Sequence, residues 1–171
     1  MTLYTRAIDI DPDLAVAHLN IACIYAKQGN LLLALEEARK ASVAAENARF
    51  RHTDDIESLF YYGALLDQTG SSEEAIEQFQ RATEMAPDAF IAHLNYGIML
   101  RKYNKPEPAF GAFSRAVELN KSSLEARYHM AATAGETGRI AIAIEQLEYV
   151  VGKDPNYEDA AMHLHALQRM K

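Results

Sequence analysis

The stretch FIAHLNYGIMLRKYNK (residues 90–105) contains the tetrapeptide AHLN, which also occurs at residues 17–20. Aligning the two copies reveals two more segments of the same kind. The four aligned segments are AVAHLNIACIYAKQGN (15–30), IESLFYYGALLDQTGS (56–71), FIAHLNYGIMLRKYNK (90–105) and LEARYHMAATAGETGR (124–139). The last three start 34 residues apart and the first gap is 41 residues. The chain therefore contains four copies of a 34-residue unit, and the first copy carries seven extra residues.

The four units share small residues at fixed positions, counted from the start of each segment. The eighth position is Ala22, Gly63, Gly97 and Ala131, and the twentieth is Ala34, Ala75, Ala109 and Ala143. Small residues let paired helices approach closely, because larger side chains would overpack the contact. The fifteenth position is Gly29, Gly70, Asn104 and Gly138. Glycine and asparagine adopt the left-handed conformation that ends a helix, so each unit is predicted to contain two helices.

Local signals also favour helices. Apolar residues recur at helical spacing, for example Leu59, Tyr62, Leu65 and Leu66, and no segment alternates with the period of a strand. Pro106 is expected in the first turn of a helix. Ser71 with Glu74, and Ser122 with Glu125, are predicted to form capping boxes at the starts of helices.

These features together resemble the tetratricopeptide repeat (TPR) family, whose unit is a helix–turn–helix of 34 residues. The resemblance covers nearly the whole chain. It implies an all-α fold, an α-solenoid of antiparallel helix pairs wound into a right-handed superhelix, with about four TPR units and partial helices at both ends.

The resemblance divides the chain as follows: a partial repeat with the second helix only (1–14), TPR 1 with a seven-residue helix extension (15–55), TPR 2 (56–89), TPR 3 (90–123), TPR 4 (124–157) and a C-terminal capping helix (158–171). In the partial repeat, the positions expected to be buried are Tyr4, Ala7, Ile8 and Ile10. The extension around residues 46–53, with Phe50, is either a harmless lengthening of the second helix through about Arg51 or a partner surface of its own. The N-terminus looks cut from a longer chain.

The fourth position of each unit varies: His18, Leu59, His93 and Arg127. The two histidines are interpreted as packing residues. Arg127 departs from the bulky apolar side chain that the family prefers. Repeat one also departs at the second helix, where Ala38 stands in place of Phe79, Phe113 and Leu147, so that its packing is expected to be thinner.

The resemblance places the first helix of each unit on the concave face. The candidate partner-binding residues there are Leu19, Asn20, Lys27, Phe60, Tyr61, Leu94, Asn95, Ile98, Arg101, Lys102, Tyr128 and His129. Phe60, Leu94 and Tyr128 are expected to be exposed apolar anchors, and exposed apolar area usually marks a partner site. Peptide-binding members of the family place an asparagine where Asn20 and Asn95 stand, although a surface asparagine that bonds only water is the alternative. Arg101 and Lys102 would attract an acidic segment.

Composition and motifs restrict the class of function. The net charge is -7, so free nucleic acid is not an expected ligand, and this balance also disfavours the RNA-binding pentatricopeptide family. The single cysteine, Cys23, excludes an internal disulfide. No membrane span, phosphate-binding loop, metal motif or nucleophile elbow is found. We therefore expect no enzyme, no cofactor, no metal, no membrane insertion and a cytoplasmic location.

The sequence thus predicts a protein–protein interaction scaffold that binds a peptide or partner segment in the concave groove. One alternative is a self-assembling structural module, a homo-oligomer in which a neighbouring chain completes the partial terminal repeat. Another is a targeting domain of a larger enzyme.

Overall fold

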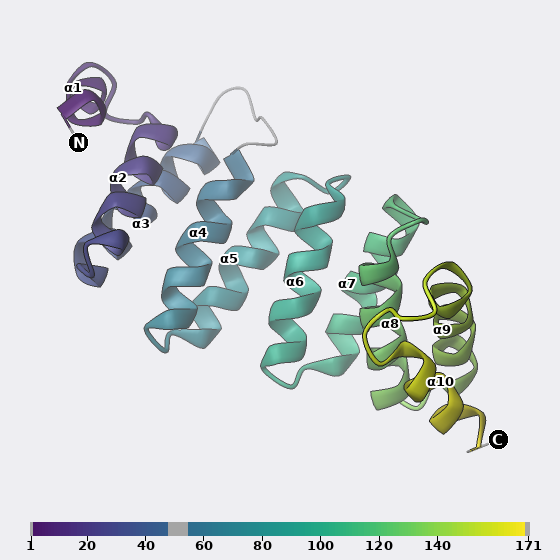
Figure 1. The fold of residues 1–171 in the computed structure, drawn as a ribbon. Coiled ribbons are helices and arrows are strands. Elements are labelled where there is room, and N and C mark those ends of the chain that lie inside the picture. Colours follow the sequence, from purple (N-terminus) through teal and green to yellow (C-terminus); the bar gives the residue numbers. More distant parts are fainter. Residues whose placement is uncertain (1, 48–54, 170–171) are drawn as a thin grey trace. The chain divides into compact units, whose positions relative to one another are not determined.

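The computed structural model of the protein describes residues 2–47 and 55–169, and within them it contains ten α-helices and no strand. Figure 1 shows the helices in chain order. Their bounds are α1 Thr2–Ile10, α2 Ala15–Lys27, α3 Leu31–Asn47, α4 Asp55–Gln68, α5 Ser72–Met85, α6 Phe90–Lys102, α7 Pro106–Leu119, α8 Leu124–Glu136, α9 Ile140–Lys153 and α10 Ala160–Gln168. The all-α, paired-helix architecture predicted from the 34-residue period is confirmed.

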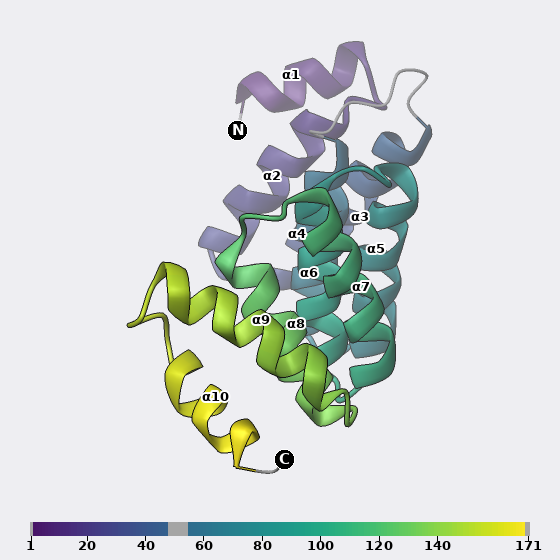
Figure 2. The ribbon, with the colours of Figure 1, turned by 90° about the vertical axis from the view of Figure 1, so that its right-hand side faces the viewer.

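The helices belong to two compact units. Unit 1 (Met1–Pro87) contains α1–α5, and unit 2 (Asp88–Lys171) contains α6–α10. Within unit 1, α2 packs on α3 and α4 on α5, and the first helices α2 and α4 also touch each other. Within unit 2, α6 packs on α7, α8 on α9, and α10 on α9 (Figure 2). First helices thus lie beside first helices in each unit.

A left-handed residue ends the first helix of each pair. Gly29, Gly70 and Gly138 have φ angles of 77°, 90° and 74°, and Asn104 has a φ of 53°. These are the fifteenth positions of the four repeats. The prediction that they stop the helix is confirmed, because a left-handed backbone cannot continue a right-handed helix.

The small eighth residue is required by the second helix. A Cβ atom placed on Gly97 would lie 2.6 Å from the ring of Phe113, and one on Gly63 would lie 2.9 Å from Phe79. Repeats one and four have alanine at the eighth position, and there the facing residue is Ala38 or Leu147. Glycine therefore occurs where the opposing residue is phenylalanine, and alanine where it is smaller.

The predicted capping boxes are wrong. The Ser71 side chain makes no capping bond at the start of α5. The cap of α8 is Ser123 rather than Ser122, and its hydroxyl accepts a hydrogen bond from the Ala126 amide at 3.1 Å. Ser122 lies one residue before the cap position because α8 begins at Leu124, and its hydroxyl donates to Asn120 Oδ1 at 2.9 Å. The Pro106 prediction is confirmed, since α7 begins at that residue.

The terminal segments differ from expectation. Helix α1 has no buried side chain: Tyr4 is exposed, Ile10 is 86% exposed, and only Ala7 and Ile8 are half-buried. The expected burial of Tyr4 and Ile10 is therefore wrong, because no helix within the described residues covers that side of α1.

In repeat one, α3 has 17 residues where α5, α7 and α9 have 14. The rest of the predicted extension, with Phe50 and Arg51, lies outside the described residues.

Candidate functional site

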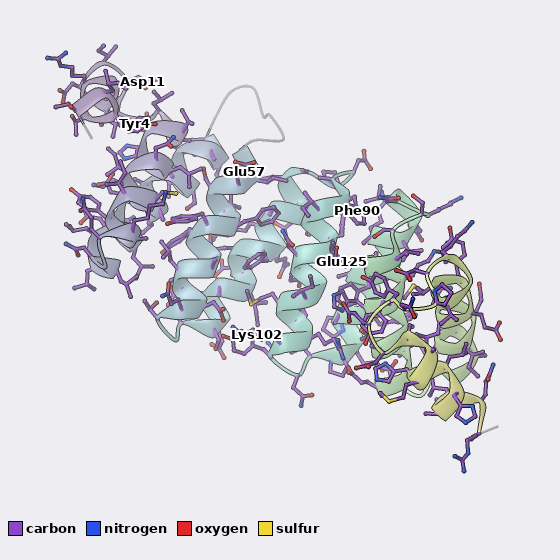
Figure 3. All side chains as sticks on the ribbon, viewed as in Figure 1. Tyr4, Asp11, Glu57, Phe90, Lys102 and Glu125 are labelled. Atoms are coloured by element: carbon purple, nitrogen blue, oxygen red, sulfur yellow. The ribbon has the colours of Figure 1, made fainter. Side chains whose placement is uncertain are left out.

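In unit 1, the first helices α2 and α4 enclose an apolar hollow. This α2–α4 hollow has a volume of about 390 Å³ and is lined by Leu19, Cys23, Glu57, Phe60, Tyr61 and Ala64. Glu57, at the start of α4 (Figure 3), is exposed and is the acidic group of the set. Leu19, Phe60 and Tyr61, all predicted from the repeat position, are thus brought together at one place.

Aromatic packing fixes the α4 side of this hollow. The ring of Phe60 stacks on that of Phe79 in α5, with centroids 5.5 Å apart and planes at 22°. Burial, and then the neighbouring Cys23 thiol, raise the pKa of Tyr61 to about 12. The Tyr61 hydroxyl is therefore neutral at physiological pH and can donate a hydrogen bond to a ligand.

The other two predicted residues of unit 1 lie outside the lining of the α2–α4 hollow. The Asn20 amide donates to its own helix, with Nδ2 2.7 Å from the Val16 carbonyl oxygen. This bond uses one of its two N–H groups and leaves the other, with Oδ1, for a ligand. Lys27 is exposed in the last turn of α2.

Unit 2 has a more polar hollow between α6 and α8. This α6–α8 hollow has a volume of about 380 Å³, and its lining residues are Ile98, Arg101, Lys102, Asn104, His129 and Glu136. Arg101 is held by Glu136, with Nη2 3.1 Å from Oε1. Lys102, at the end of α6 (Figure 3), is exposed. Four predicted residues therefore meet here: Ile98, Arg101, Lys102 and His129.

His129 forms an uncharged wall of the α6–α8 hollow. Its ring stacks on Phe113 at 5.2 Å, and its Nδ1 atom is buried without a hydrogen-bond partner. Burial is the main cause that lowers the pKa of His129, and the Arg101 charge lowers it further. At neutral pH the imidazole is therefore neutral and adds no positive charge to Arg101 and Lys102.

Two predicted anchors are not exposed. Leu94 is 3% exposed and Tyr128 is 8% exposed, so the expectation that they are exposed apolar contacts is wrong. Tyr128 packs under the C-terminal segment: its ring lies 5.6 Å from that of Tyr157 and 5.9 Å from that of His163 in α10. Tyr128 is buried because α10 covers the face of α8 that an uncapped repeat would leave open. Asn95 is half-buried on α6.

A third hollow was not predicted from the sequence. This α8–α10 hollow has a volume of about 270 Å³, and its lining is mainly apolar: Arg101, Ala131, Ala132, Gly135, Glu136, Leu147, His163, Ala166 and Leu167. The small residues Ala131, Ala132 and Gly135 leave space on α8 opposite Leu167, which approaches a Cβ on Gly135 only to 3.9 Å. The small residues at these three positions of α8 are the sequence feature from which this hollow could have been predicted.

The described part of the chain offers neither a metal-binding cluster nor a helix suited to a membrane. Among those residues, no three or more His, Cys, Asp or Glu side chains are grouped so that they could hold a metal ion. None of the described helices combines the length and the apolar character that a bilayer crossing requires.

With the repeat geometry in place, comparison with known proteins decides the family. Models of the tetratricopeptide repeat match residues 13–88 and 63–123. The chain belongs to the tetratricopeptide repeat family. The helix pairs α2–α3, α4–α5 and α6–α7 lie within the matched residues, and α8 with α9 forms a fourth pair that follows them. The α2–α4 and α6–α8 hollows lie between first helices of neighbouring pairs.

Among curated relatives, the type IV pilus assembly protein PilF of Pseudomonas aeruginosa is 28% identical over 129 residues, which is 74% of this chain and 48% of PilF. The chain thus spans about half the length of that relative. Among solved structures, YrrB, a TPR protein with an unusual peptide-binding site, has a TM-score of 0.79 at 23% identity, covering 98% of this chain and 82% of YrrB. The first TPR of Spaghetti (RPAP3) bound to the HSP90 peptide SRMEEVD has a TM-score of 0.64 at 20% identity, covering 70% of this chain and 94% of that one. The two structures share the fold.

Proposed function

We propose that the chain is a non-catalytic interaction module that holds a peptide, or an extended segment of a partner protein, on the first helices of its TPR units. The α2–α4 hollow carries this proposal. Its volume of about 390 Å³ is at the lower end of the range of ligand sites, roughly 300 to 1,000 Å³. Leu19, Cys23, Phe60 and Ala64 give it an apolar floor, and such a surface open to solvent favours a partner.

An apolar side chain of the ligand would fill the α2–α4 hollow. The Phe60 ring is already packed on Phe79, so little side-chain entropy is lost when a ligand contacts it. Glu57 at the rim favours a ligand with a basic group beside its apolar anchor, chiefly through the rate of association. Asn20 would contribute a donor and an acceptor to the ligand backbone.

The α6–α8 hollow of unit 2 favours the opposite charge. Arg101 and Lys102 bring two cations, and Glu136 already pairs with Arg101. Ile98, 37% exposed, adds an apolar contact beside them. We therefore propose an acidic ligand segment for unit 2, with Asn95 on the same helix as a second backbone-binding amide.

The likeness to TPR proteins that bind peptides supports the same role. YrrB is a TPR protein with a peptide-binding site, and the RPAP3 TPR was solved with an HSP90 peptide.

An NMR titration against a peptide library tests the proposal. Ala64→Arg would fill the α2–α4 hollow from an exposed position, and Gln80→Arg is the matched control on the exposed side of α5. Peptides selected by the unmodified protein are expected to shift the amide signals of α2 and α4, and to lose binding with Ala64→Arg only. Binding that is equal in both variants would remove the α2–α4 hollow from the account. Binding that is unchanged in the double variant Asn20→Ala with Asn95→Ala would show that these two amides do not hold the ligand backbone.

Self-assembly is the second candidate, and the apolar surface of α1 favours it. Leu3 is 77% exposed and Ile10 is 86% exposed. A second copy could cover them, as the partial terminal repeat suggests. Light scattering over a range of concentrations decides: a mass that rises with concentration and is reduced by Leu3→Ser with Ile10→Ser supports assembly, and a constant monomer mass rejects it.

A further inference from the structure

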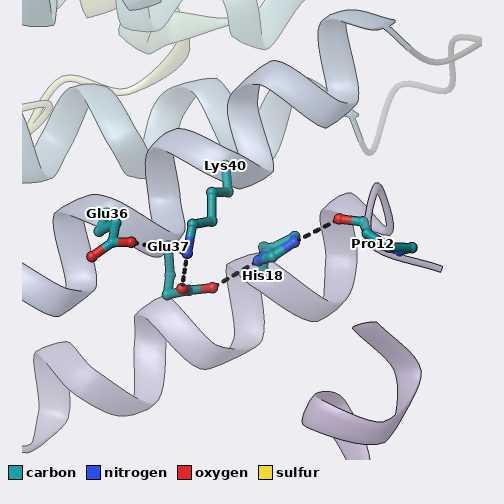
Figure 4. Close-up of polar contacts among 5 residues, drawn as sticks. All are labelled: Pro12, His18, Glu36, Glu37 and Lys40. Carbon is teal, nitrogen blue, oxygen red and sulfur yellow. Dashed lines mark hydrogen bonds and ion pairs between the residues drawn. The ribbon is translucent and has the colours of Figure 1, made fainter. Parts of the chain in front are cut away.

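The buried His18 ring makes two hydrogen bonds that join three parts of unit 1 (Figure 4). Its Nδ1 lies 2.7 Å from Glu37 Oε2 in α3. Its Nε2 lies 2.9 Å from the carbonyl oxygen of Pro12, in the turn that connects α1 to α2. The side chain thus joins the turn after α1 to the second helix of the first TPR.

Both partners of the ring can only accept. A backbone carbonyl has no proton to donate, and an ionised carboxylate has none either. Burial raises the pKa of Glu37, but hydrogen bonds from Lys40 and His18 outweigh it, so the pKa is lowered overall. Lys40 Nζ lies 2.7 Å from Glu37 Oε1. Glu37 is therefore ionised at neutral pH.

A neutral imidazole has a single N–H group and cannot donate to two acceptors at once. The observed arrangement, with Glu37 on one nitrogen and Pro12 on the other, requires a proton on each nitrogen. The two contacts can therefore both be hydrogen bonds only when the ring carries a proton on each nitrogen.

The fourth TPR supports this reading with a permanent cation at the same position. Arg127 occupies the place of His18, and its Nε donates to the carbonyl of Lys121 at 2.9 Å, six residues back as in the His18–Pro12 bond. Its Nη1 donates to Oε1 of Gln146, which occupies the place of Glu37. Position four thus donates twice in both repeats, once to the preceding turn and once to the second helix.

We propose that His18 is a pH-sensitive latch, whose doubly protonated ring ties the turn before α2, and with it α1, to α3, and whose loss of one proton releases that tie. The charge-assisted bond to Glu37 is the stronger of the two, so the remaining proton stays on Nδ1. The lone pair on Nε2 then faces the Pro12 oxygen. Because α1 has no buried side chain, it has little apolar contact to hold it when this bond is lost.

Other charged groups lie on the elements around His18. The turn contributes Asp11 and Asp13, and α1 contributes Arg6 and Asp9, all exposed. Asp11 is already engaged, since its Oδ1 accepts from the Asp13 amide.

The helices on the other sides add further charges. Helix α3 contributes Glu36 and Lys40, which pair at 3.0 Å, and the exposed Arg39, and α4 contributes the exposed Glu57. Water and salt screen exposed charges, whereas the bonds to Glu37 and Pro12 are direct and partly buried. The direct contacts therefore govern the latch.

NMR of the full chain with ¹⁵N-labelled histidine tests the proposal, since it reports which ring nitrogens carry a proton. We expect two protonated nitrogens on His18 near pH 6, and a single proton, on Nδ1, at alkaline pH. In Glu37→Gln the neutral amide can donate to Nδ1, so a neutral ring meets both partners. His18 is then expected to bind its second proton about 10-fold more tightly in the unmodified protein than in Glu37→Gln, the effect of one charge-assisted hydrogen bond.

Two results would overturn the latch. One is a single protonated nitrogen on His18 near pH 6 in the unmodified protein, a measurement that needs no variant. The other is equal proton affinity in the unmodified protein and Glu37→Gln. His165→Gln, a change at an exposed histidine of α10, is the control and should leave the His18 titration unchanged.

Discussion

Helix α1 buries no side chain, whereas α10 buries Ala160 and adds Leu164 and Leu167 to an apolar cluster with Tyr128 and Leu147. Each terminal helix packs against a complete TPR of its own unit. Helix α1 is tied through its connecting turn, where the Pro12 carbonyl contacts His18 of α2, and α10 is held by buried apolar side chains.

The difference lies in a few repeat positions. At the fourth position the first repeat has His18 and the fourth has Arg127. At the position of the second helix that faces the eighth residue, the first repeat has Ala38 and the fourth has Leu147. A histidine tie responds to pH in the physiological range, whereas an arginine tie and an apolar contact do not. The same repeat backbone can therefore carry either a pH-sensitive contact or a pH-insensitive one, depending on the side chains at these positions.

The largest expected effect comes from copying the first repeat into the fourth with Leu147→Ala, which places alanine where Ala38 stands. Leu147 is 2% exposed, and removing a buried leucine costs about 2–5 kcal/mol. Urea unfolding measures the change in the free energy of unfolding. Leu32→Ala, at a side chain 81% exposed, is the control and should stay within about 0.5 kcal/mol. Equal effects of the two changes would mean that α10 is not held by the apolar cluster.

A second change copies Ala22 into the third repeat. Gly97→Ala gains helix propensity, yet its new Cβ would lie 2.6 Å from the Phe113 ring, so overpacking is expected to cost about 1–3 kcal/mol. Gly111→Ala is the matched control in α7, because nothing lies within 4 Å of its Cβ, and it should be stabilising by up to about 1 kcal/mol. Thermal unfolding of both variants measures the contrast. A stabilising Gly97→Ala would refute the pairing of glycine with phenylalanine.

A third experiment exchanges the ties. Arg127→His with Gln146→Glu gives the fourth repeat the residues of the first. Stability is expected to be retained near pH 6 and to fall by about 1.5 kcal/mol toward pH 8, where one hydrogen bond of the ring is lost. Urea unfolding at the two pH values measures it. No pH dependence in the double variant would show that the repeat position does not determine the tie.

The smallest effect concerns the α2–α4 hollow. Burial and Cys23 raise the pKa of Tyr61 to about 12, against about 10 in the unfolded chain. Its contribution to stability is therefore fully present below pH 10 and lost as the pH rises toward 12. An ultraviolet titration of the phenolate, with Tyr61→Phe subtracted, should show Tyr61 ionising last. Ionisation near pH 10 would place its hydroxyl in water.

Much of the fold could be predicted from the sequence because the deciding features are local. Gly29 and Asn104 adopt the left-handed conformation of a turn, and Gly97 allows a close helix contact. Both properties belong to the residue types themselves and need no knowledge of the rest of the fold. The Ser122 capping box failed because α8 begins one residue later than that box requires, which makes Ser123 the cap.

The candidate site was less predictable, because exposure depends on which element covers a face. The repeat position correctly brought Leu19 and Phe60 to one hollow, and their role in binding stays a prediction. The same position wrongly made Tyr128 an exposed anchor, since the sequence does not give the depth to which α10 covers α8. His18 was assigned to packing, although Glu37 at the facing position was a readable signal of its polar role.

Hydrogen exchange of α1 and α10 in the same sample tests the central comparison most directly. Protection factors of the two helices are compared at about pH 6 and about pH 8, the range in which histidine titrates. The account predicts that protection of α1 falls with rising pH while that of α10 stays constant. Protection that is constant in α1, or that falls equally in both helices, would contradict it.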